Sequence, residues 1–146
     1  RAISGLLRDS LRGYGSVSVR LEGKSMLPFL RSGTLMTVRN CDIRDIHIGD
    51  IVIFKKDNIT IAHRVLKKIR SDGRFFLRTK SDISFLPEPL VSCEELIGKV
   101  VAFKRHGKDI KIDNFIFRSL GSGAGIVFPF IARIRSLFRQ VVRYAV

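Results

Sequence analysis

The stretch that decides the fold runs from residue 49 to residue 69 and reads Gly-Asp-Ile-Val-Ile-Phe-Lys-Lys-Asp-Asn-Ile-Thr-Ile-Ala-His-Arg-Val-Leu-Lys-Lys-Ile. Residues 49 and 50 are a turn signal, and the unbroken apolar run over 51–54 is typical of a buried strand. The polar residues 55–58 predict a tight turn. Residues 59–69 are rich in β-branched side chains, which predicts a strand that returns beside the first one. The stretch therefore predicts a β-hairpin.

Short strands joined by tight turns extend this pattern in both directions. Val17, Val19 and Leu21 alternate with polar residues, which predicts a strand with one buried face. Further strands are predicted over 34–39, 74–79, 96–104 and 110–112, with polar connections over 40–48 and 80–95. We therefore expect residues 16–113 to form a compact, mainly β domain, either a β barrel or a folded antiparallel sheet.

The two ends of the chain differ from this β pattern. Residues 1–15 place leucines at helical spacing before two glycines, which predicts a short N-terminal amphipathic helix. Residues 114–146 contain no Asp or Glu, and after Pro129 arginines recur every four residues opposite an apolar face. This pattern predicts a basic amphipathic helix. Residues 126–146 either lie in a membrane interface or dock on the β domain with their arginines in solvent.

Composition and charge narrow the classes of partner. The chain has 146 residues, of which 45% are hydrophobic, and this fits one domain with an ordinary core rather than a disordered chain. Lys and Arg number 27 against 13 Asp and Glu, for a formal charge of +14. This excess favours an anionic partner, either nucleic acid or a membrane surface, over a merely basic soluble surface. No apolar run reaches about 18 residues, so we predict no ordinary transmembrane helix.

The two cysteines carry little functional signal. Cys41 and Cys93 lack CxxC spacing and have no clustered histidines nearby, so a structural zinc site is not expected. We expect two buried free thiols, and we predict no metal and no cofactor.

Three polar residues are candidates for catalysis. Ser25 lies in the loop over residues 23–28, His63 on the predicted return strand, and Asp82 in the connection over 80–95. A serine hydroxyl is a weak nucleophile that needs a base, and the base needs an orienting group. Taken singly, the three are more often a turn residue, a structural histidine and a turn cap. Spacing does not join them into a site, because a triad has no fixed chain order.

Five short boxes follow one another in the chain: Gly23-x-Ser25-Met26-x-Pro28, the run over residues 49–54, His63-Arg64-Val65, Thr79-Lys80-x-Asp82, and Ile97-Gly98-Lys99-Val100. In this order they resemble the signal peptidase I and LexA-like superfamily of serine peptidases, the S24/S26 type. The closer resemblance is to the archaeal and endoplasmic-reticulum signal peptidases, whose base is a histidine where bacterial-type enzymes have a lysine. The resemblance covers residues 16–105.

This resemblance implies a role for each matching residue. Ser25 would be the nucleophile, with its backbone N–H as an oxyanion donor, and His63 would be the general base and then the general acid. Asp82 would orient His63 or support it electrostatically. Met26 and Pro28 are the residues predicted at the substrate site, in a cleft where a peptide binds as an added strand. Because Met26 is flexible and apolar, it suits either the lining of a groove or an anchor of the loop in the core. The implied activity is cleavage of a signal or leader segment from a protein or peptide precursor through an acyl-enzyme.

Two positions depart from the family pattern. Ser81 replaces a usual glycine, and Gly23 replaces a serine that in many signal peptidases supports the oxyanion hole. An oxyanion hole here would therefore depend on backbone donors. Glu88 is a candidate for a second acidic residue by its proximity in sequence alone.

Other readings remain open at this point. The main alternative is a non-catalytic module on the same fold that binds a membrane surface or nucleic acid, and a pseudoenzyme is a further one. Nucleic acid is the less expected partner, since no helix-turn-helix or aromatic-interleaved basic pattern is present. We expect a peripheral membrane protein, which would be cytoplasmic if no upstream anchor is missing. The sequence makes no prediction about the oligomeric state.

Overall fold

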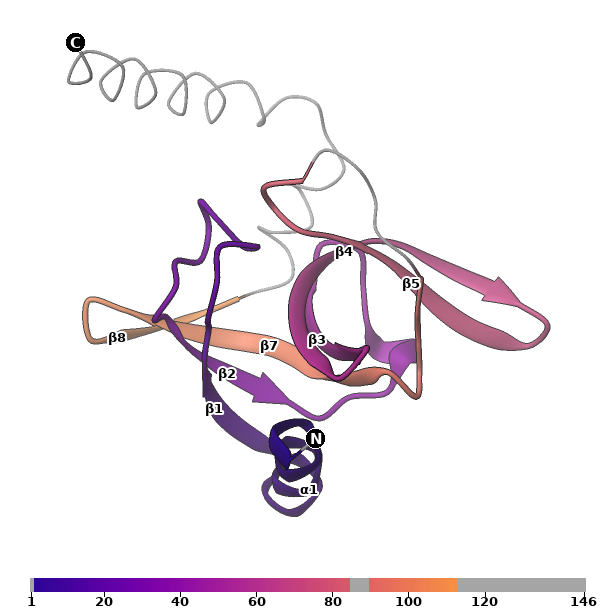
Figure 1. Cartoon of the computed structure of the whole chain (residues 1–146), viewed down its shortest axis with the longest axis horizontal. Helices are drawn as coiled ribbons and strands as arrows, with labels where there is room; N and C mark the ends of the chain where they lie inside the picture. Colours follow the sequence, from indigo (N-terminus) through magenta and orange to yellow (C-terminus); the bar gives the residue numbers. More distant parts are fainter. Residues whose placement is uncertain (1, 85–89, 113–146) are drawn as a thin grey trace, which may run out of the picture.

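The computed structural model describes residues 2–84 and 90–112, with side chains from residue 4 (Figure 1). The predicted C-terminal helix over 126–146 and Glu88 lie outside the described residues. The described elements are α1 (Ala2–Tyr14), β1 (Ser16–Arg20), β2 (Leu35–Arg39), the 3-10 helix η1 (Ile43–Asp45), β3 (Ile51–Lys56), β4 (Ile59–Ser71), β5 (Arg74–Lys80), β6 (Leu90–Ser92), β7 (Leu96–Arg105) and β8 (Lys108–Lys111).

The strands form one antiparallel sheet in the order β1-β2-β7-β3-β4-β5-β6, with β8 paired to β7. In the part of the chain that the structure describes, β1 and β6 end the sheet, so it is open. In Figure 1 the sheet coils around β3, the β4–β5 hairpin projects from one side, and α1 lies beside β1. The prediction of a mainly β fold with a short N-terminal helix is confirmed, in its folded-sheet form.

Strand β3 is buried on both faces, which explains its unbroken apolar run. Ile51 and Ile53 belong to one hydrophobic cluster, while Val52 and Phe54 belong to a second one on the opposite face. Successive side chains of a strand point to opposite faces, so both faces of β3 must be covered. Leu11 of α1, only 1% exposed, joins the first cluster, and the helix therefore shares the core of the sheet.

The hairpin turn between β3 and β4 is set by its two central residues. Asp57 and Asn58 have φ of 48° and 68°, in the left-handed region. This is the backbone that a type I′ turn requires, and its twist matches that of the paired strands. Lys56 then pairs with Ile59 and Val52 with His63, as the predicted hairpin requires.

Two expectations are wrong in detail. The connection over 80–95 contains β6, a three-residue strand that pairs with β5; a segment this short shows no alternation to detect. Both cysteines are free as expected, but only Cys41 is partly buried and Cys93 is exposed, because it lies in the turn between β6 and β7. No helix among the described residues is long and apolar enough to span a membrane.

Gly98 of β7 is a position where the sheet leaves no room for a side chain. A Cβ there would lie 2.6 Å from the carbonyl oxygen of Arg39 and 2.9 Å from a methyl carbon of Val38. We expect Gly98→Ala to lower the free energy of unfolding by about 1–3 kcal/mol, measured by urea denaturation. Gly5→Ala is the control, because a Cβ added at Gly5 would have nothing within 4 Å. Alanine in α1 should raise the free energy of unfolding by about 0.5–1 kcal/mol. Wild-type stability of Gly98→Ala would contradict this packing.

Candidate active site

The loop that carries Ser25 is fixed at both ends by its own sequence. Gly23 has φ of 88°, a backbone that other residues rarely adopt, which accounts for glycine at this position. Met26 is 0% exposed and Leu30 is 1% exposed, and both pack into the first hydrophobic cluster. Ser25 itself is only half-buried. The core thus anchors the loop and leaves its serine near the surface.

The Ser25 hydroxyl donates a hydrogen bond to the carbonyl oxygen of Ala62 on β4, at 3.4 Å. This distance is at the long end for an O–H donor, so the bond is weak. The backbone N–H of Ser25 makes no hydrogen bond to any described residue. It is therefore available as the oxyanion donor that the sequence predicts.

His63 follows Ala62 on β4 but faces the other side of the sheet. Its imidazole is 4% exposed and packs edge-on against Phe54, with ring centroids 5.6 Å apart. Phe54 belongs to the second cluster, whereas the side chain of Ala62 belongs to the first. The structure therefore brings Ser25 to the backbone beside His63 and places the imidazole in a buried, aromatic environment.

Asp82 is joined to the Ser25 loop by a backbone hydrogen bond and to β4 by an ion pair. Its N–H donates to the carbonyl oxygen of Ser25 at 2.7 Å. Its carboxylate accepts two hydrogen bonds from Arg64, from Nε at 2.9 Å and from Nη2 at 2.8 Å. The pair is largely buried, at 17% exposure for Arg64 and 12% for Asp82. Whether Asp82 also orients His63 stays a prediction.

Arg64 is the site residue that sequence reasoning missed. Besides Asp82, its guanidinium donates to the carbonyl oxygen of Gly49 at 3.0 Å and lies over the Phe29 ring, 5.2 Å from the centroid. One side chain thus links β4, the turn before β3, the loop after β5 and the Ser25 loop. Its place in the His-Arg-Val box was the available signal, but the box does not say which group the arginine binds.

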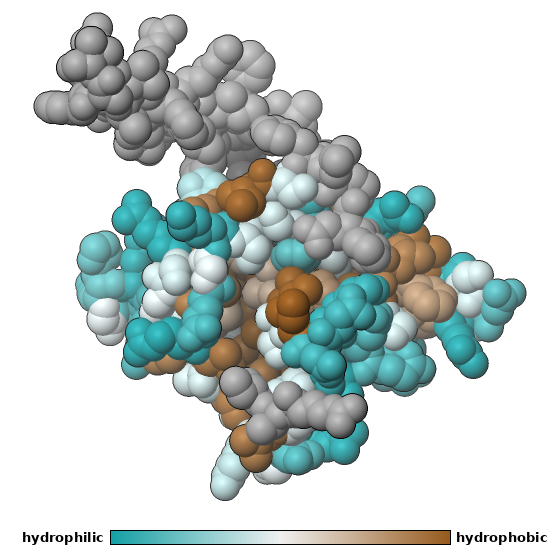
Figure 2. Space-filling model, in the orientation of Figure 1, coloured by the Kyte–Doolittle hydropathy of each residue, from teal (hydrophilic) through white to brown (hydrophobic). Residues whose placement is uncertain are grey.

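Ser25 lies at the edge of a groove of about 610 Å³. Its walls come from α1, from residues 19–25 and from the start of β4 over 58–62, and Met36 and Ile53 give it an apolar floor. Figure 2 shows apolar side chains near the middle of the surface in that view, bordered by hydrophilic ones. His63 is not among the described residues that line the groove.

The predicted substrate residues Met26 and Pro28 do not line this groove. Met26 is held in the core, and Pro28 is exposed on a separate depression with Phe29 and Phe103. Residues 23–30 form turns and bends, and the N–H of Leu30 donates to the carbonyl oxygen of Met26 at 2.8 Å, so the burial of Met26 does not bring Pro28 to the same side. Of the two roles that a methionine can fill here, the structure gives Met26 that of core anchor.

One edge of β4 borders the groove and is open. Residues 59–64 pair with β3, but β5 pairs with β4 only from Arg64 onward. Within residues 2–84 and 90–112, no strand pairs with residues 59–63 on the side away from β3. Val65 accepts a hydrogen bond from the N–H of Gly49 and donates one to the carbonyl oxygen of Asp50, at 2.8 Å each, so its backbone groups point toward the β3 side. Backbone groups alternate in direction along a strand, so those of Thr60 and Ala62 point the other way, toward the groove.

The described residues hold no group of three or more His, Cys, Asp or Glu side chains that could bind a metal ion. Around the Ser25 loop the described residues offer a serine hydroxyl, an available backbone N–H and an open strand edge.

Comparison with known proteins gives one family. A sequence model of a protein family described as Peptidase S24-like matches residues 7–101, from α1 into β7, and the match includes Ser25, His63 and Asp82. No curated protein matches the chain.

The Arg64–Asp82 pair should make a large contribution to stability because it is nearly desolvated. Removing one partner of a buried pair leaves the other charge uncompensated, so we expect Asp82→Asn to lower the free energy of unfolding by about 3 kcal/mol. Asp42→Asn is the matched control, since it breaks the Asp42–Arg44 pair, whose side chains are 43% and 71% exposed. That control should change little. Equal, small losses for both variants in urea denaturation would contradict a structural role for Asp82.

Proposed function

The chain belongs to the Peptidase S24-like family, and on that premise we propose that it is a serine endopeptidase of the signal peptidase type. It would cleave a signal or leader segment from a protein or peptide precursor through an acyl-enzyme. One observation carries the proposal. The Ser25 hydroxyl lies against the backbone next to His63, at the edge of an apolar groove that borders an open strand edge.

The reaction needs the Ser25 hydroxyl to exchange its partner. The bond to Ala62 is long at 3.4 Å, so rotation of the serine side chain releases it at little cost. The imidazole of His63, which packs against Phe54 on the other side of β4, would also have to turn toward Ser25. It would then accept the proton as Ser25 attacks the scissile carbonyl, and would return it to the leaving amine. The N–H of Ser25 would donate to the oxyanion that forms. Water attack, again with His63 as base, would release the acyl group.

The open edge of β4 suits an extended peptide. Thr60 and Ala62 turn backbone groups toward the groove, so a substrate strand can pair with them antiparallel or parallel to β4. The floor of Met36 and Ile53 favours apolar side chains in that strand. A leader segment, which is apolar and extended when it is bound, has the chemistry that this groove accepts.

Within this proposal, Asp82 and Arg64 are positioning residues. The carboxylate of Asp82 is engaged by the Arg64 fork, and its N–H holds the carbonyl of Ser25. Together they would keep Ser25 at the edge of the groove. From its position in the ion pair with Arg64, Asp82 would also support His63 electrostatically.

A non-catalytic binding module on the same fold is the second candidate. It is favoured by the 4% exposure of His63 and by its absence from the described residues lining the groove. The charge of +14 would then attract an anionic membrane surface or nucleic acid. Such a module would bind without cleaving.

Substitution of Ser25 or His63 separates the two candidates. We expect Ser25→Ala and His63→Ala each to lower kcat/KM for a fluorogenic leader peptide by at least about a thousandfold, because each removes one member of a cooperating unit. Ser16→Ala and His106→Asn are the matched controls, since both residues are exposed and neither lines the groove. Cleavage that survives in all variants equally, or is absent from the wild type while the peptide binds, would reject the peptidase.

The pH profile tests the histidine base independently. An imidazole must be neutral to take the proton of Ser25, and an ordinary histidine takes up its own proton at about pH 6.5. We expect kcat/KM to fall about tenfold per pH unit below that region. A profile that stays flat between about pH 5 and pH 8, with the protein still folded, would argue against His63 as the base.

A further inference from the structure

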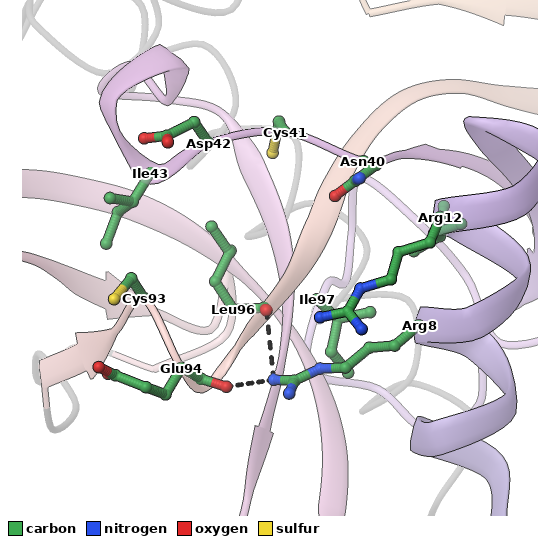
Figure 3. Close-up of a pocket in the computed structure, with 11 residues that line it drawn as sticks. Arg8, Arg12, Asn40, Cys41, Asp42, Ile43, Cys93, Glu94, Leu96 and Ile97 are labelled. Atoms are coloured by element: carbon green, nitrogen blue, oxygen red, sulfur yellow. Dashed lines mark hydrogen bonds between the residues drawn. The ribbon is translucent and has the colours of Figure 1, made fainter.

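A second pocket, of about 430 Å³, is walled by α1, by residues 40–43 after β2 and by the turn between β6 and β7 (Figure 3). Helix α1 contributes to both pockets of interest. Ser4 and Leu7 line the Ser25 groove, whereas Arg8, Leu11 and Arg12 line this second pocket. The second pocket contains none of the predicted catalytic residues.

Two arginines of α1 converge on this pocket. Arg8 and Arg12 are four residues apart, so they lie one above the other on the same face of the helix. Figure 3 shows both side chains reaching from α1 into the pocket, with their guanidinium groups near each other. Arg8 is held in place, because it donates to the backbone carbonyls of Glu94 and, at 3.3 Å, of Leu96. The positive charge at the pocket is therefore fixed in position.

Carboxylates of the described residues leave these two charges without an ion-pair partner. Throughout the described part of the chain, no ion pair joins Arg8 or Arg12 to a carboxylate. Asp42 lines the pocket, but its carboxylate is engaged by Arg44 at 2.9 Å. The carboxylate of Glu94 points away from Arg8 in Figure 3. Like charges at this helical spacing repel each other, and a bound anion would reverse that cost.

The remaining polar groups of the pocket suit an anion. Asn40 lines the same pocket, and its side-chain amide has two N–H donors. Burial raises the pKa of the Cys41 thiol to about 11, so the thiol stays protonated and adds no negative charge at neutral pH. The N–H of Asn40 donates to the carbonyl of Gly15 at 3.0 Å, which ties this wall to the end of α1.

We propose that this pocket binds a phosphate group, either free phosphate or that of a small phosphate monoester. A guanidinium fork matches two oxygens of a phosphate, and two forks side by side match its double charge better than the single charge of a carboxylate. The size of the pocket admits a small molecule of this kind. The proposal does not depend on peptide cleavage, so its failure leaves the proposed peptidase untouched.

Calorimetric titration with inorganic phosphate, at constant ionic strength, tests the proposal. We expect saturable binding at one site of the wild-type protein. Arg12→Gln should weaken it by at least about tenfold, because a hydrogen bond between two charged groups is lost. Arg8→Lys keeps the charge but loses the fork, and it should weaken binding as well. Arg105→Gln is the matched control, since it removes one exposed arginine of β7 outside the pocket and should bind as the wild type does.

A parallel titration with glycerol 3-phosphate identifies the source of the phosphate. Tighter binding than that of inorganic phosphate would assign the site to a monoester, and equal binding would assign it to free phosphate. Thermal unfolding without phosphate checks that each variant folds. The proposal is overturned if the wild type shows no saturable binding. It is equally overturned if Arg105→Gln weakens binding as much as Arg12→Gln does, because the anion would then be responding to net charge alone.

Discussion

The fork between the Arg64 guanidinium and the Asp82 carboxylate is the contact on which the candidate site depends. Its two hydrogen bonds, of 2.9 and 2.8 Å, join β4 to the loop after β5. The same guanidinium holds the Gly49 carbonyl and covers the Phe29 ring, and Asp82 holds the Ser25 carbonyl. A largely desolvated ion pair is stabilising only when its geometry satisfies both partners, and a bidentate fork does so. The ion pair thus helps to hold Ser25 in place, together with the buried Met26 and Leu30 of its own loop.

The alternation of β4 distributes the functional groups around that pair. Arg64 and Ala62 face the side of the Ser25 loop, and His63, between them, faces Phe54 on the other side. The backbone of the same strand remains open beside the groove over residues 59–63. One strand therefore supplies the arginine of the ion pair, the predicted base and the edge proposed for substrate. A peptidase built this way needs a rearrangement of Ser25 and His63 toward each other when substrate binds.

Much of the fold is predictable from local sequence. The alternation in residues 16–20, the unbroken apolar run over 51–54 and the polar turn after it predict a strand, a buried strand and a hairpin. The structure has all three, as β1, β3 and the β3–β4 pair. Strand β6 was missed because three residues are too short for a period, and only its pairing with β5 makes it a strand. The site was less predictable. The short sequence boxes contain Ser25, His63 and Asp82, but they do not show that Arg64 binds Asp82, because this contact forms only in the folded sheet. Met26 was ambiguous for the same reason, since a flexible apolar side chain suits both a groove and a core.

The central claim is that Ser25 and His63 act together on a peptide bound along β4. The most direct measurement is a crystal structure of the wild-type protein with a non-cleavable leader peptide in the groove. The account predicts that Ser25 Oγ leaves the Ala62 carbonyl and lies within about 3 Å of His63 Nε2, with the peptide paired to Thr60 and Ala62. A bound peptide with the imidazole of His63 still packed on Phe54 and Ser25 still bonded to Ala62 would contradict it.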